Sequence, residues 1–204
     1  MRPVEAAPMI LDEQLPVFDV SIAVHQVVAA DPLTTWRAAR DLDFMSVHTP
    51  LTDLSIWLRG LPARLRREPP PALTSLRLSQ GGGLPGWLSL GEQEGYEIAF
   101  GAVGKFWQPS ITWRDVPRAE FAGFAQPGYG KIGCNFTVRP YGTGRTLLTY
   151  ECRVATTDPA SRRRFARYWR LIRPFVAHIM RAAAATIAAD AGRQAARRQP
   201  STVS

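Results

Sequence analysis

The chain has 204 residues, of which 46% are hydrophobic, and a formal net charge of +8. This length suits one sizeable domain, and no run of about 18 uncharged apolar residues marks a membrane-spanning helix. Two cysteines are too few for a disulfide framework, and neither has a zinc-type spacing to another Cys or His. We expect a cytoplasmic protein that uses no metal and no cofactor.

The N-terminal region divides into a leader and a first strand. Residues 1–16 are expected to be a flexible leader, because proline and small residues interrupt each short apolar run. Prolines and acidic residues also stand where a signal peptide would need a basic end and an apolar stretch. From Phe18 to Val28 alternate residues are apolar, which predicts a strand with one buried face.

Two helices are expected after this strand. Asp31 can cap free backbone amides and Pro32 fits a first helical turn, so the pair predicts a helix start. An apolar stripe predicts a second helix over residues 51–67. Glycines and prolines in residues 72–86 indicate an irregular connection.

The middle of the chain is typical of β-structure. Trp87–Leu90 and Tyr96–Ala102 alternate on either side of a turn at Gln93–Gly95, which predicts a hairpin. A further strand is expected at Ser110–Val116 and a short helical piece at Arg118–Phe124.

The clearest strands are Gly128–Tyr141 and Arg145–Thr156, joined by a turn with two glycines that tolerate positive φ. Pairing their apolar faces predicts the register.

This register places Cys134 opposite or nearly opposite Cys152. Asn135 then faces Glu151 on the other side of the sheet.

One long helix is predicted from Asp158 to Asp190, again opened by an aspartate and a proline. Apolar residues recur along it every three or four positions, which predicts one buried stripe. Pro174 is expected to bend or split this helix. Residues 192–204 are polar and basic, and are expected to form a disordered tail.

This order of elements resembles the START-related helix-grip superfamily, often called SRPBCC, which includes lipid-transfer domains and polyketide aromatase/cyclases. The segments that carry the resemblance are Phe18–Val28, 101–107, 128–136, 150–154 and 163–169. The resemblance implies an α+β fold in one domain over residues 17–191. A curved antiparallel sheet of about six or seven strands would wrap around the long C-terminal helix, with two short helices after the first strand.

A helix-grip fold implies a cavity between the sheet and the last helix, and such cavities are mostly apolar. We expect it to bind a hydrophobic or amphipathic small molecule, such as a lipid, a polyketide or an aromatic metabolite. The alternative is that the same side chains only fill a core. The candidate ligand-binding residues are Phe100, Trp113, Phe136, Tyr150, Trp169 and Val176.

Whether the protein is also an enzyme is left open. An aromatase/cyclase-like activity on a polyketide-type substrate would need a proton-transferring group in the cavity. The candidates for it are Tyr150, His178, Glu151 and Arg153. Glu151, Arg153 and Lys131 are also interpreted as an ion network on a solvated face of the sheet.

The remaining predictions concern metals and partners. His25, His48 and His178 have no metal-ligand spacing. The net positive charge comes mostly from arginine and suggests transient contact with an anionic membrane. We expect no nucleic-acid partner, because no recognised binding motif accompanies the basic runs. The oligomeric state is left open.

Overall fold

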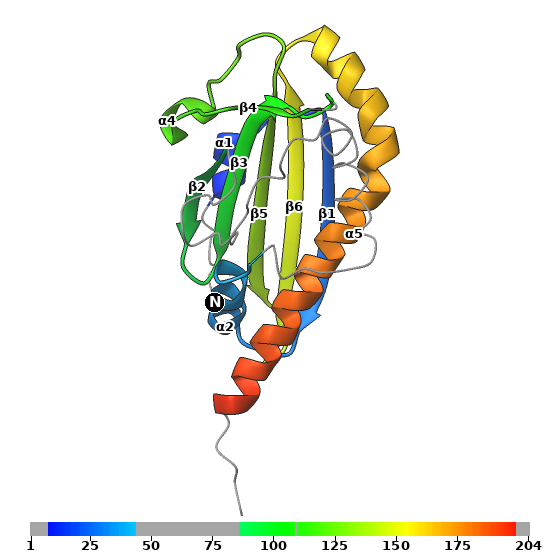
Figure 1. Ribbon diagram of the computed structural model, residues 1–204. Helices are drawn as coiled ribbons and strands as arrows, with labels where there is room; N and C mark the ends of the chain where they lie inside the picture. The colour runs from blue at the N-terminus through cyan, green and yellow to red at the C-terminus, as the bar shows by residue number, and fades with distance from the viewer. Residues whose placement is uncertain (1–7, 44–85, 109, 199–204) are drawn as a thin grey trace, which may run out of the picture.

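The computed structural model of the protein describes residues 8–43, 86–108 and 110–198 (Figure 1). In chain order the elements are α1 (Ile10–Gln14), β1 (Val20–Val28), α2 (Pro32–Arg40), β2 (Trp87–Gln93), β3 (Glu97–Lys105), β4 (Thr112–Arg114), α4 (Arg118–Phe121), β5 (Gly130–Pro140), β6 (Thr146–Thr156) and α5 (Pro159–Arg198).

Six strands form one antiparallel sheet with the order β1-β6-β5-β3-β2, and β4 pairs with β3. The helix α5 runs across one face of this sheet, where it contacts β1, β6 and α2 (Figure 1). We call the face under α5 and α2 the inner face, and the opposite face the outer face. A curved antiparallel sheet holding one long C-terminal helix is a helix-grip fold, so the predicted fold class is confirmed.

The register of β5 and β6 follows from their alternating side chains. Cys134 pairs with Cys152, and Asn135 pairs with Glu151, as predicted. Because successive side chains of a strand point to opposite faces, the cysteines lie on the inner face and the polar pair on the outer face.

Both predicted aspartate caps are present. Asp31 accepts hydrogen bonds from the Thr34 amide at 2.9 Å and the Thr34 hydroxyl at 2.6 Å. The Thr34 hydroxyl and neighbouring amides hold the pKa of the Asp31 carboxyl below its usual value. At the start of α5, Asp158 accepts from the amide and hydroxyl of Ser161 and from the amide of Gly128.

Pro174 lies inside α5, which continues through it without a break. The axis of the helix changes direction along its length, as Figure 1 shows between its yellow and orange parts. A bend is therefore confirmed, whereas a split is not. A proline removes one backbone hydrogen bond, and the remaining bonds on either side hold the helix together.

The predicted leader is wrong in its second half. Within residues 1–16, Ile10–Gln14 form α1, and Leu11 and Leu15 are fully buried against the outer face. A Cβ atom added at Gly133 would lie only 2.7 Å from Cδ1 of Leu11, so the glycine permits this close packing. The ordered domain thus begins before residue 17.

The C-terminal boundary also differs from the prediction. The helix α5 continues to Arg198, so residues 192–198 are helical and not a disordered tail. The helix was predicted to end at Asp190, but the alanines, arginines and glutamine of residues 193–198 favour helix. The second helix predicted over residues 51–67 and the connection over 72–86 lie outside the described residues, except for Gly86.

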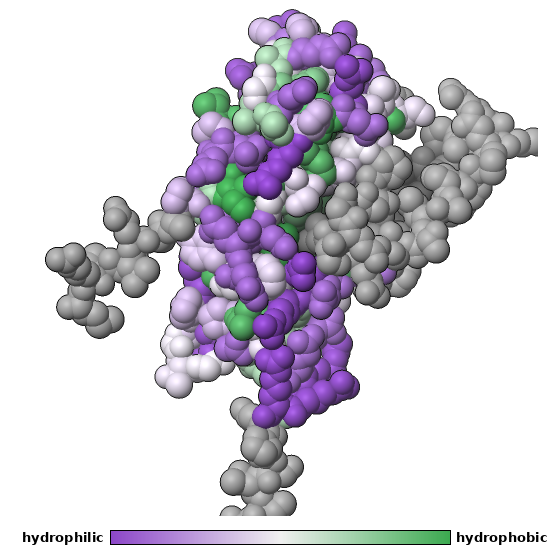
Figure 2. Space-filling model, turned by 90° about the vertical axis from the view of Figure 1, so that its left-hand side faces the viewer, coloured by the Kyte–Doolittle hydropathy of each residue, from purple (hydrophilic) through white to green (hydrophobic). Residues whose placement is uncertain are grey.

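Seen from the edge formed by β2, the described surface is largely hydrophilic (Figure 2). The hydrophobic side chains visible there form small, separate groups. Large continuous apolar patches are what mark an interaction surface. The apolar side chains are concentrated instead on the inner face of the sheet.

Candidate functional site

Three aromatic rings from three neighbouring strands meet at the centre of the inner face. The ring centroid of Phe136 lies 4.2 Å from that of Tyr150 and 5.9 Å from that of Phe100. All three side chains are buried. The cross-strand pairing explains this contact, because Phe136 stands opposite Tyr150 in the register of β5 and β6.

Two tryptophans extend this group toward the edge of the sheet. The ring centroid of Trp87 on β2 lies 5.7 Å from that of Phe100, and the ring centroid of Trp113 on β4 lies 6.2 Å from that of Trp87. Both tryptophans are half-buried. Gly104 leaves room for Trp113, because a Cβ at this glycine would lie 2.8 Å from the indole. We call Trp113, Trp87, Phe100, Phe136 and Tyr150 the aromatic row.

A second aromatic group joins the start of α5 to the sheet. Phe165 lies 5.6 Å from Phe106 and 5.7 Å from Trp169. Val176, further along α5, is half-buried and packs against the same core. This group fixes the first half of α5 over the inner face.

The structure brings all six predicted ligand-binding residues to one hydrophobic cluster between the sheet and α5. Phe100, Phe136, Tyr150 and Trp169 are buried within it, whereas Trp113 and Val176 lie partly exposed beside it. Their role as ligand contacts stays a prediction.

Next to the aromatic rings of the inner face lie the Tyr150 hydroxyl and the thiols of Cys134 and Cys152. Cys134 stands opposite Cys152 in the register of β5 and β6, two positions from the pair of Phe136 and Tyr150. Burial raises the pKa of Tyr150 well above its usual value, and the Cys152 thiol together with burial does the same for the pKa of Cys134. Both groups are therefore neutral near pH 7, and they offer hydrogen bonds without charge.

Glu151 and Arg153 do not lie near this site. They are on the outer face, where the Arg153 guanidinium contacts Glu151 and Asp12, each at 2.7 Å. The interpretation of this network as solvated is wrong for Arg153, whose side chain is only 8% exposed. The N-terminal segment covers it, and the ring of Phe18 lies 5.0 Å from the guanidinium.

Lys131 is separate from that network. Its ammonium donates hydrogen bonds to the carbonyl oxygens of Ala122 at 2.8 Å and Phe121 at 3.3 Å, at the end of α4. Burial lowers its pKa. The three residues expected to form one cluster therefore make two separate sets of contacts on the outer face. Glu151 and Arg153 contact the N-terminal segment, and Lys131 contacts the end of α4.

A buried carboxylate on the outer face was not predicted. Glu97 is fully buried and accepts hydrogen bonds from the Ile10 amide at 2.6 Å and from the Leu11 amide at 3.2 Å. The side-chain amide of Asn135 donates to it at 2.6 Å. A signal for this burial was present in the sequence, because the apolar side chains of Ile10, Leu11 and Leu15 need a surface of the protein to pack against.

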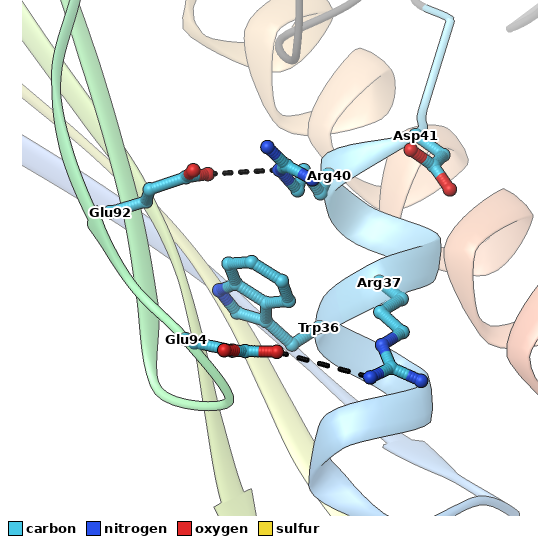
Figure 3. A pocket seen from close by; sticks show the side chains of 6 residues that line it. All are labelled: Trp36, Arg37, Arg40, Asp41, Glu92 and Glu94. Carbon is cyan, nitrogen blue, oxygen red and sulfur yellow. Dashed lines mark hydrogen bonds and ion pairs between the residues drawn. The ribbon is translucent and has the colours of Figure 1, made fainter.

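A polar pocket of about 560 Å³ lies between α2 and the β2–β3 hairpin (Figure 3). Its lining residues are Trp36, Arg37, Arg40, Asp41, Glu92 and Glu94. The charged side chains pair across it, with Arg40 at 3.1 Å from Glu92 and Arg37 at 3.9 Å from Glu94. A pocket of paired charges does not suit an apolar ligand.

The two histidines within the described residues, His25 and His178, do not form a site. His25 is exposed and hydrogen-bonds to Thr149 at 2.9 Å, His178 is half-buried on α5, and His48 lies outside the described residues. Among the described residues no group of three His, Cys, Asp or Glu side chains could hold a metal ion.

No family model matches the chain, and no curated protein is similar enough to count as a match. Solved structures do match most of its length. CalU16 from Micromonospora echinospora is 17% identical, with 87% of this chain and 86% of that chain covered and a TM-score of 0.29. Protein CV1439 from Chromobacterium violaceum is 13% identical, with 84% and 96% covered and a TM-score of 0.36.

A third solved structure, Ara h 8.0201, is 11% identical, with 83% of this chain and 98% of that chain covered and a TM-score of 0.31. Identities and TM-scores this low say nothing about ligand or activity. The helix-grip fold of this chain rests on its own strand order and on the position of α5.

Proposed function

We propose that the protein binds a hydrophobic or amphipathic small molecule, such as a lipid, a polyketide or an aromatic metabolite, between the inner face of the sheet and α5. The observation that carries this proposal is the aromatic row. Its rings follow one another across β4, β2, β3, β5 and β6 at centroid separations between 4.2 and 6.2 Å.

The two ends of the row differ in a way that suits an amphipathic ligand. Trp113 and Trp87 are half-buried, so a ligand can reach their faces from solvent. Tyr150, at the other end, is buried and brings a hydroxyl into apolar surroundings. An apolar body packed on the rings gains from burial, and a polar group placed near Tyr150 gains a hydrogen bond.

The aromatase/cyclase alternative has less support. Two of its four candidate groups, Glu151 and Arg153, lie on the outer face. A general acid or base works best with a pKa near the working pH, whereas burial raises the pKa of Tyr150 well above its usual value. We therefore propose binding without assigning a reaction.

A titration with a polarity-sensitive apolar dye tests the proposal. We expect saturable binding to the folded wild-type protein and, because Trp113→Ala removes the accessible end of the aromatic row, a loss of affinity of several-fold to roughly tenfold. Tyr141→Ala removes an exposed aromatic side chain away from the row and should bind the dye like the wild type. A folded protein that binds no apolar probe would overturn the proposal.

A further inference from the structure

The outward side of the first half of α5 carries four arginines around one leucine. Arg163, Arg164, Arg167 and Arg170 are exposed, and Leu171 is 72% exposed. Spacings of three and four residues place such side chains on one side of a helix. We call these five residues the basic face.

Within the described residues, no acidic side chain pairs with the basic face. Residues 159–189 contain no Asp or Glu. Arg162, one position before the basic face, pairs with Asp19 at 2.6 Å, but none of the four arginines of the basic face forms an ion pair within residues 8–43, 86–108 and 110–198. Like charges three or four residues apart repel one another, so an external anion would stabilise this part of the helix.

We propose that the basic face docks the protein on the surface of an anionic lipid membrane. Each arginine near such a surface is attracted by the negative headgroups. Leu171, on the same side of the helix as these arginines, would enter the boundary between headgroups and acyl chains, which is the position that apolar side chains of surface-bound helices take.

The same helix has features that fit a surface contact better than a membrane span. By length and composition alone, α5 could cross a membrane. Its opposite side, however, carries Phe165, Trp169 and Ile187, which are buried in the core. The helix can therefore lie along a membrane while it keeps its place on the sheet.

The exposed leucine favours a membrane over a nucleic acid. Phosphates of a nucleic acid would also attract the arginines, but they offer no apolar partner to Leu171. A membrane satisfies both the charge and the apolar side chain. This docking does not depend on the proposed ligand, because the basic face points away from the aromatic row.

Sedimentation with lipid vesicles tests the docking. The full chain is mixed with phosphatidylcholine vesicles and with vesicles that also contain phosphatidylglycerol. Its binding to random-sequence duplex DNA is measured in a separate titration. We expect binding to the anionic vesicles, little binding to phosphatidylcholine alone, and weakening by salt. Replacing all four arginines of the basic face by glutamine should weaken vesicle binding by roughly fivefold per arginine.

A charge-matched control separates the basic face from net charge. The control variant replaces four exposed arginines elsewhere by glutamine, namely Arg114, Arg118, Arg145 and Arg197, and should keep most of the vesicle binding. Each of the two quadruple variants lowers the formal net charge from +8 by four, to +4. Circular dichroism and thermal melting verify that both variants fold.

Leu171→Ser provides the second test, because it leaves every charge in place. We expect it to weaken binding to anionic vesicles several-fold and to leave any DNA binding unchanged. Equal binding of the two quadruple variants, equal binding to the two vesicle types, or binding to DNA without binding to vesicles would each overturn the proposal. Dye binding to the aromatic row is measured separately, so either proposal can fail alone.

Discussion

The carboxylate of Glu97 accepts a hydrogen bond of 2.6 Å from the side-chain amide of Asn135 on the neighbouring strand, and both side chains are fully buried. The first amides of α1 complete the shell of this carboxylate. A buried charge is tolerated only when hydrogen bonds surround it. The pair therefore fastens the N-terminal segment to the outer face.

Glu97→Gln should destabilise the protein by about 1–3 kcal/mol, because the new NH₂ group confronts backbone amides that can only donate. Urea unfolding followed by circular dichroism measures this change. Glu94→Gln is the matched control, since Glu94 is exposed and its ion pair with Arg37 is long, at 3.9 Å. It should change the free energy of unfolding by less than about 1 kcal/mol. Equal effects of the two substitutions would contradict the role of Glu97.

Gly133→Ala should destabilise the protein by about 1–3 kcal/mol through overpacking. The added methyl would lie 2.7 Å from the nearest Leu11 carbon and 3.1 Å from the nearest Leu15 carbon. The same urea experiment on Gly123→Ala serves as the control, because nothing lies within 4 Å of a Cβ at Gly123. Stability unchanged in Gly133→Ala would mean that α1 does not pack tightly on β5.

Asp158 should make the protein less stable in acid. Hydrogen bonds from Ser161, and from the amide of Gly128, lower the pKa of its carboxyl from the usual 3.8. A group with a depressed pKa in the folded state contributes stability above its unfolded pKa, and loses that contribution as the pH falls below about 4.

Asp158→Asn removes this titration, although asparagine can still cap a helix. We therefore expect a smaller drop in melting temperature between pH 7 and pH 3 for Asp158→Asn than for the wild type. Asp115→Asn, at an exposed loop position, should keep the wild-type drop. If Asp158→Asn keeps it too, the cap does not titrate as described.

Cys134 should resist alkylation in the folded protein. Thiolates react and thiols do not, and the pKa of Cys134 is raised well above 9.0 by the Cys152 thiol and by burial. Mass spectrometry after iodoacetamide treatment at pH 8 should find little modification in native protein and rapid modification in urea. Fast labelling of Cys134 in native protein would show that the inner face is open to solvent at this point.

The sheet was predictable because its clearest strands alternate cleanly. Matching the apolar faces of β5 and β6 predicts Cys134 opposite or nearly opposite Cys152, and the structure pairs the two residues directly. The burial of the other face was not predictable in this way. Alternation places Arg153 on a solvated face, and no burial is predicted for Glu97. A segment far away in the sequence covers both side chains.

The candidate site was predictable only as a set of aromatic residues. Large apolar side chains at inward strand positions include Phe100, Phe136 and Tyr150, and the structure places these three in contact. Trp87 was missed as a member of the row, although its inward position follows from its pairing with Ala102. The order of strands in the sheet, which brings β2 and β4 beside β3, is not written in any single segment.

The hydrogen bond between the Ile10 amide and Glu97 joins residues 87 positions apart. Contacts over such distances form slowly, because a long stretch of chain must first be ordered. During synthesis on the ribosome, the first helix therefore emerges long before the strands that receive it. The outer face of the sheet can be completed only after β3 and β5 have been made, because both strands supply side chains that hold α1.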